Sequence, residues 1–166
     1  MGKSAITTLA MLHEHGWVSF WAQNDGWQFT YAFKLNDPAQ KIVVERSSRY
    51  LASLTEGGSV EVWRLKGADA KFEWELQFKS VTDIVSNTTI ENQFFVQMSS
   101  LDSEGSAAKQ DSLLLFQFSR PQNLVKFWKF KIELTRILFM DTDPSVLLTI
   151  NKNGEMQRLY CCESTT

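Results

Sequence analysis

The chain has few of the residues that cross-link or interrupt a fold. Its 166 residues include two cysteines and three prolines. The cysteines, Cys161 and Cys162, are neighbours, and neighbouring side chains of a strand point to opposite faces, so we expect no disulfide between them. A small secreted framework held by several disulfides is therefore excluded. Pro38 and Pro144 each follow an aspartate in a turn signal between strand-like segments.

Long apolar runs and an excess of basic residues are also missing. No run approaches the roughly 18 apolar residues that a membrane-spanning helix needs, and the first residues lack the layout of a cleavable signal. We therefore expect an intracellular protein, of the cytoplasm or the nucleus, without membrane contact. Lys and Arg total 17 and Asp and Glu total 19, so the formal charge is −2. Any nucleic-acid contact would need a local basic patch.

Histidine is scarce, which limits the available chemistry. The two histidines, His13 and His15, stand at one glycine turn on either side of a glutamate. Two imidazoles that leave a strand in alternate directions make a poor metal site, and no further histidine can act as the base for a Ser or Cys nucleophile. We expect no catalytic residues, no metal and no cofactor, and hence a protein that is not an enzyme.

The chain is instead rich in hydrophobic and aromatic residues that alternate with polar ones. Hydrophobic residues make up 43% of the sequence and aromatic residues 13%, which is enough for a packed core. In Trp27–Leu35 and Phe72–Phe78 an apolar residue occupies every second position, which places the aromatics on one sheet face. No segment keeps a helical apolar stripe for three turns. The sequence therefore predicts an all-β fold.

A short phrase occurs three times along the chain. Each copy has a leucine, then a glycine, then an aromatic residue or a second leucine, at the same spacing. The copies are Leu9, Gly16 and Trp21; Leu51, Gly58 and Trp63; and Leu147, Gly154 and Leu159. Recurrence of this kind marks a repeated supersecondary unit, and we interpret each copy as two strands joined by a tight glycine hairpin.

The strand-like runs fall into a four-strand cycle within one domain. Complete cycles cover residues 41–80 and 81–132, and partial cycles of three strands cover residues 1–35 and 135–162. We expect residues 99–110 to form an inserted loop, because small and polar residues replace the tight hairpin turn of the third cycle. This grouping predicts about fourteen strands.

A four-stranded unit of about 40 to 50 residues, with a glycine hairpin and a tryptophan that ends its third strand, resembles the WD40-type repeat of β-propellers. The best match is residues 50–65, YLASLTEGGSVEVWRL, and the resemblance covers nearly the whole chain. It implies degenerate WD40-type repeats that form about three and a half four-stranded antiparallel blades of a partial β-propeller. Since propellers typically close with roughly four to eight blades, it also implies that another chain or segment completes the ring.

The repeats depart from the family pattern in their polar residues. The Trp-Asp pair of the family is Trp63-Arg64 here, and no Gly-His pair precedes any cycle. We therefore expect the blades to lack the buried polar network of that family and to be held together by apolar packing.

The resemblance also suggests a function. Propellers commonly serve as rigid platforms, so we expect a non-catalytic protein–protein interaction scaffold within a larger multiprotein assembly, with other protein subunits as partners. The alternative is a small-ligand-binding β-barrel of the lipocalin type. Alternating, aromatic-rich strands in a chain of 166 residues also suit a closed barrel of roughly eight to ten strands.

One segment, KFWKFK, interleaves lysines with aromatic residues. It contains Lys126, Trp128, Lys129 and Lys131, and aromatic rings beside cations are how single-stranded nucleic acids are bound. The same composition is typical of an edge strand whose lysines prevent edge-to-edge pairing. We favour the edge strand and keep an RNA contact as the alternative.

Overall fold

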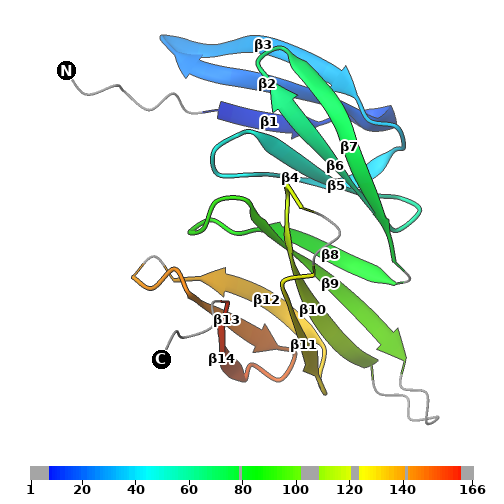
Figure 1. The fold of residues 1–166 in the computed structure, drawn as a ribbon, viewed down its shortest axis with the longest axis vertical. Helices are drawn as coiled ribbons and strands as arrows, with labels where there is room; N and C mark the ends of the chain where they lie inside the picture. Colours follow the sequence, from blue (N-terminus) through cyan, green and yellow to red (C-terminus); the bar gives the residue numbers. More distant parts are fainter. Residues whose placement is uncertain (1–7, 79, 102–108, 121–123, 141, 162–166) are drawn as a thin grey trace.

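The computed structural model describes residues 8–78, 80–101, 109–120, 124–140 and 142–161. In these ranges it contains fourteen β-strands and one 3-10 turn, η1 (Glu14–Gly16), and no helix there is long and apolar enough to cross a membrane. The strands form four antiparallel sheets of three or four strands each (Figure 1). The all-β prediction is confirmed.

Each sheet is a meander in which consecutive strands pair side by side. Sheet 1 contains β1 (Thr8–Leu12), β2 (Trp17–Asn24) and β3 (Gly26–Lys34). Sheet 2 contains β4 (Ala39–Val44), β5 (Tyr50–Thr55), β6 (Ser59–Lys66) and β7 (Asp69–Gln77). Sheet 3 contains β8 (Val81–Ser86), β9 (Gln93–Leu101), β10 (Lys109–Gln117) and β11 (Lys126–Phe130). Sheet 4 contains β12 (Leu134–Phe139), β13 (Val146–Asn151) and β14 (Met156–Tyr160).

The hairpin of sheet 3 has longer strands than expected. β9 continues to Leu101 and β10 begins at Lys109, and these two residues are paired. The predicted boundaries of the inserted loop, residues 99 and 110, therefore lie within strands. Residues 102–108 of that loop lie outside the described residues.

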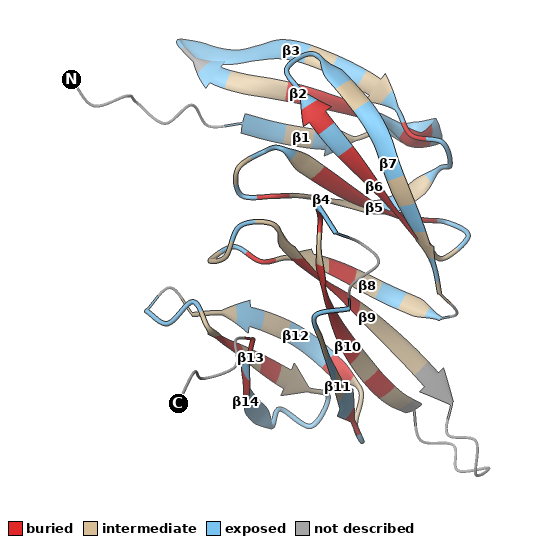
Figure 2. Ribbon diagram, in the orientation of Figure 1, coloured by how far each residue is buried: buried red, intermediate tan, exposed pale blue. Residues whose placement is uncertain are grey.

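The sheets pack face to face in chain order, because successive side chains of a strand point to opposite faces and both faces are apolar. Figure 2 shows the buried residues concentrated along β6, β9 and β10, and exposed residues along β3 and β12. The junction of sheets 1 and 2 buries Val18, Phe20, Leu35, Leu51, Trp63 and Leu65. The junction of sheets 2 and 3 buries Ala52, Leu54, Val60, Val62, Ile84, Phe94, Val96, Leu114, Phe116 and Phe118. The junction of sheets 3 and 4 buries Phe95, Leu113, Leu115, Phe130, Leu134, Leu147, Leu159 and Cys161.

Sheets 2 and 3 are thus covered on both faces, and sheets 1 and 4 on one face each. Four antiparallel sheets packed in this way have the arrangement of blades in a partial β-propeller. The lipocalin-type alternative is not favoured, because a barrel needs one sheet closed on itself, and the described strands belong to four separate open sheets.

The three repeated phrases form hairpins with the same pairing. Across each hairpin the first and last residues of the phrase lie opposite one another: Leu9 and Trp21, Leu51 and Trp63, and Leu147 and Leu159. Gly16, Gly58 and Gly154 have φ angles of +79°, +85° and +80°, a left-handed conformation that glycine adopts without strain. The glycine therefore sets the turn that brings the two ends of the phrase together.

We expect Gly58→Ala to lower the free energy of unfolding by roughly 1–2 kcal/mol, since a Cβ strains a residue in the left-handed region. Crowding would contribute nothing, because no atom lies within 4 Å of that Cβ position. The matched control is Gly57→Ala, whose Cβ would meet only Thr55 Oγ1 at 3.8 Å, an ordinary contact. Chemical denaturation measures both variants, and equal losses of stability would contradict the role given to the Gly58 backbone.

Candidate interaction surfaces

Each sheet has one face toward the preceding sheet and one toward the following sheet, which we term its leading and trailing faces. In sheet 2 the leading face carries Leu51 and Trp63, and the trailing face carries Leu54. The equivalent pair of sheet 4, Leu147 and Leu159, lies on the leading face against sheet 3. The repeat therefore places its paired hydrophobic residues on the leading face.

Sheet 1 has an open leading face. Leu9 and Trp21 have the same cross-strand pairing as the pairs in sheets 2 and 4, but no described sheet covers them. The open leading face consists of Leu9, Met11, Trp17, Trp21, Trp27 and Phe29. Five of these six side chains are exposed, Phe29 by 57%, and Trp21 is half-buried. It is a broad aromatic surface in contact with solvent.

This open face repeats the geometry of a covered one. The ring centroids of Trp21 and Phe29 lie 5.5 Å apart at 77°, and those of Trp63 and Phe72 lie 5.5 Å apart at 74°. In both sheets the strand register shifts at the tryptophan. Trp63 is buried and lies 5.3 Å from the ring of Phe33 in sheet 1. Sheet 1 therefore leaves Trp21 partly open to solvent at the position where sheet 2 buries Trp63 against a neighbour, while the partner ring is exposed in both sheets.

Sheet 4 has an open trailing face. Its hydrophobic side chains are Val146, Leu138, Leu148, Ile150, Met156 and Tyr160, of which Val146 is buried, and its two cations are Arg136 and Arg158. Met156 is 62% exposed and Tyr160 is 53% exposed. Eight of the twelve exposed large hydrophobic side chains of the described residues lie on the two open faces. Apolar surfaces gathered in this way mark sites of contact with other molecules.

The lysine–aromatic segment forms β11, which lies at an edge of sheet 3, as predicted. Lys126 and Trp128 are half-buried on one side of the strand, whereas Lys129 is exposed on the other side and Lys131 follows the strand. Lys126 Nζ donates a hydrogen bond to the Tyr160 carbonyl oxygen at 2.7 Å and lies 5.7 Å from the Trp128 ring. The four residues therefore do not share one face, and an RNA contact stays a prediction.

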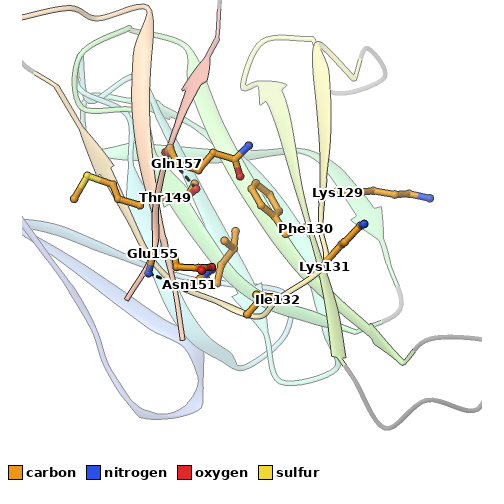
Figure 3. Close-up of a pocket in the computed structure, with 10 residues that line it drawn as sticks. Lys129, Phe130, Lys131, Ile132, Thr149, Asn151, Glu155 and Gln157 are labelled. Atoms are coloured by element: carbon orange, nitrogen blue, oxygen red, sulfur yellow. Dashed lines mark hydrogen bonds between the residues drawn. The ribbon is translucent and has the colours of Figure 1, made fainter. Parts of the chain in front are cut away.

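A pocket of about 380 Å³ lies between the end of β11 and the β13–β14 hairpin (Figure 3). Lys129 and Lys131 line it, and Figure 3 shows the Lys129 side chain extending away from the other labelled residues. Asn151 Nδ2 donates to Glu155 Oε2 at 2.7 Å, and Asn151 Oδ1 accepts from the Glu155 backbone N–H at 3.0 Å. These bonds shape the hairpin turn. Within the described ranges, no group of three or more His, Cys, Asp or Glu side chains is arranged to hold a metal ion.

Buried polar side chains stand beside the tryptophans of sheets 1 and 2. Glu61 is 2% exposed and accepts hydrogen bonds from Trp63 Nε1 at 3.2 Å and from Ser53 Oγ at 3.5 Å. Ser19 Oγ accepts from Trp21 Nε1 at 3.0 Å. The apolar packing of these blades is therefore supplemented by buried hydrogen bonds, in which a glutamate or a serine is the acceptor for the tryptophan. In both sheets the acceptor stands two residues before the tryptophan, on the same face of the strand, whereas the family pattern has an aspartate directly after the tryptophan. A polar residue two positions before the tryptophan is the signal by which the sequence could have predicted this hydrogen bond.

A second buried acid joins sheets 3 and 4. Asp111 Oδ2 accepts hydrogen bonds from the Leu134 backbone N–H at 2.8 Å and from Gln97 Nε2 at 2.9 Å. Gln97 Nε2 also donates to the Leu134 carbonyl oxygen at 3.2 Å. Asp111 is 1% exposed, so protein groups replace water at this oxygen. The three residues hold the start of β12 against sheet 3. No local pattern in the sequence predicts this contact.

No family model and no curated protein matches the sequence. Among the solved structures that match the fold are two from Saccharomyces cerevisiae and Bacteroides fragilis. Sqt1 of Saccharomyces cerevisiae is 8% identical with a TM-score of 0.57, and the match covers 95% of this chain and 57% of that chain. A Bacteroides fragilis protein assigned as a 6-phosphogluconolactonase is 11% identical with a TM-score of 0.56, and the match covers 87% of this chain and 44% of that chain. The chain spans about half the length of these structures, and at such identities the likeness shows a β-propeller-like fold alone.

Burial raises the pKa of Glu61 above its ordinary value of 4.5, and this effect outweighs the hydrogen bond from Trp63, which lowers the pKa. The native state therefore binds the proton more tightly than the unfolded chain, and the free energy of unfolding falls as pH rises from 4.5 through the folded-state pKa. Glu61→Gln keeps an acceptor for Trp63 and removes this dependence. We expect the variant to gain stability over the wild type at about pH 7 but not at about pH 4.

The control for this comparison is Glu73→Gln, at an exposed position of β7, which should leave the pH dependence unchanged. Denaturant titrations at both pH values measure the difference. If Glu61→Gln and the wild type differ by the same free energy of unfolding at both pH values, the raised pKa of Glu61 would be contradicted.

We expect Asp111→Ala to lower the free energy of unfolding by about 2–3 kcal/mol, because it leaves the buried Leu134 N–H without its acceptor. Asp111→Asn keeps one side-chain oxygen for that N–H and should lose less. Ser112→Ala, on the opposite face of β10, is the control and should change little. Thermal unfolding compares the three variants, and an Asp111→Ala protein as stable as the control would exclude the contact as a stabilising one.

Proposed function

We propose that the chain is a non-catalytic protein–protein interaction module, a WD40-like propeller segment that acts within a larger multiprotein assembly. The observation that carries this proposal is the pair of open apolar faces. Each is the kind of sheet face that the same molecule buries in its three internal junctions. Water is a poor solvent for such a surface, and another protein is the partner whose side chains can cover it.

The kinship with WD40-type repeats rests on the hairpins. In two of them, a leucine and a tryptophan meet across strands that a positive-φ glycine connects. The indole N–H of each tryptophan donates a hydrogen bond to a polar side chain of its own strand. These features support a relationship that the low identity to solved structures does not by itself establish.

A non-catalytic role is supported by the places that the acidic side chains occupy. Glu61 and Asp111 are buried between sheets, and Glu155 is engaged in its own hairpin turn. Each of these three carboxylates therefore has a structural task in the folded chain. We keep the prediction of an intracellular location, in the cytoplasm or the nucleus, which rests on the sequence.

The test compares the proteins that co-purify with tagged variants from cells. Phe29→Asp changes the open leading face, and Met156→Asp changes the open trailing face; both positions are more than half exposed, so folding should be unaffected. Leu124→Asp is the matched control, since Leu124 is 47% exposed but lies on neither face. We expect quantitative mass spectrometry to find most co-purifying proteins lost with the two face variants and retained with the control. Identical sets for all three variants would overturn the proposal.

A further inference from the structure

The two open faces are of opposite kinds. In each of the three internal junctions, the trailing face of one sheet packs against the leading face of the next. Sheet 1 leaves a leading face open and sheet 4 leaves a trailing face open. The chain therefore carries, at its two ends, the two halves of one further junction of the type that it already forms three times.

We propose that two copies of this chain join head to tail, with the open trailing face of sheet 4 in each copy against the open leading face of sheet 1 in the other, and close a ring of eight sheets. This inference rests on the proposed function, because both depend on the same open faces, and it names the partner as a second copy.

The number of sheets is what makes closure possible. Four sheets in each copy give eight in a pair, and propellers typically close with roughly four to eight blades. In such a pair both copies use both faces, so the two contacts are equivalent and no apolar face is left over for further growth.

The leading face of sheet 1 is already built for this contact. Its Trp21–Phe29 pair has the same separation as the Trp63–Phe72 pair, and sheet 2 packs Trp63 of that pair against sheet 1. A conformational change is therefore unnecessary before docking. A rigid, preformed aromatic surface loses little entropy when a partner covers it.

The trailing face of sheet 4 supplies cations that suit an aromatic partner. Arg136 and Arg158 stand among its hydrophobic residues, and neither makes an ion pair with a described residue. A guanidinium group stacks on the face of a tryptophan or phenylalanine ring. The arginines of one copy therefore complement Trp21, Trp27 and Phe29 of the other.

Arg136 also has a precedent within the chain. It pairs with Ile150 as Lys41 pairs with Leu54 in sheet 2. Lys41 Nζ lies 2.6 Å from Asp83 Oδ1, in the first strand of the following sheet. A cation at this position of one sheet thus reaches across to the next, which in the proposed ring is sheet 1 of the second copy.

The experiment measures the molar mass of the full chain by light scattering during size-exclusion chromatography, over a range of concentrations. We expect a mass of twice 19.1 kDa for the wild type that does not increase further with concentration. Phe29→Asp and Met156→Asp should each raise the dissociation constant at least roughly tenfold and give monomers. Leu124→Asp should remain a dimer, and circular dichroism should show all variants folded.

Mixing the two face variants separates head-to-tail joining from other dimers. The leading face is intact in Met156→Asp and the trailing face is intact in Phe29→Asp, so an equimolar mixture should recover a dimer through one contact. A dimer that only one of the two variants disrupts would mean that like faces meet and would overturn the proposal. So would a monomeric wild type, or a mass that grows without limit as in an open polymer.

The two proposals fail separately. A monomeric wild type whose face variants still lose their co-purifying proteins would end the ring and leave the interaction module in place. The opposite result is a dimer of the expected kind together with a co-purification in which neither the wild type nor the Leu124→Asp control retains any protein other than a second copy. That result would establish the ring and end the role in a larger assembly.

Discussion

A β-sheet with apolar side chains on both faces is stable in water only when both faces are covered, and this constraint organises the whole molecule. Sheet 3 shows it most directly, because Phe94 and Phe95 are neighbours and both are 0% exposed. Phe94 packs toward sheet 2 and Phe95 toward sheet 4, since alternate residues of a strand face opposite ways. Stacking in chain order follows from that requirement. The outer faces of sheets 1 and 4 are where the described residues leave this requirement unmet.

The hairpins decide which face of a sheet leads. A positive-φ glycine and a fixed strand pairing put the leucine and its partner residue on one side in sheets 1, 2 and 4. A one-residue slip in register would send these side chains to the opposite face. The same local device therefore gives sheets 1, 2 and 4 the same polarity, and it makes the ends of the stack complementary to each other.

Polar contacts between the sheets add direction to the apolar packing. Lys41 bonds Asp83 across sheets 2 and 3, and Asp111 bonds the start of β12 across sheets 3 and 4. Glu61 lies at the junction of sheets 1 and 2, where burial raises its pKa. Hydrophobic surfaces tolerate sliding, whereas a buried hydrogen-bonded acceptor is satisfied at one relative position. The Lys41–Asp83 and Asp111–Leu134 contacts therefore help to fix how sheets 2, 3 and 4 sit against one another, whereas the hydrogen bonds of Glu61 to Trp63 and Ser53 lie within sheet 2.

The sequence by itself determined the all-β fold class and where most of the strands lie. Alternation over Trp27–Leu35 and Phe72–Phe78, the glycine turns and the lysines of the edge strand are local signals, and each corresponds to an element of the structure. The ends of the loop at 99–110 were misplaced, because pairing of Leu101 with Lys109 depends on the partner strand. Only the tertiary structure decided that Glu61 and Asp111 are buried, and that the faces of sheets 1 and 4 are open. Those properties arise from contacts between sheets, which join residues far apart in the chain and leave no periodic trace in it.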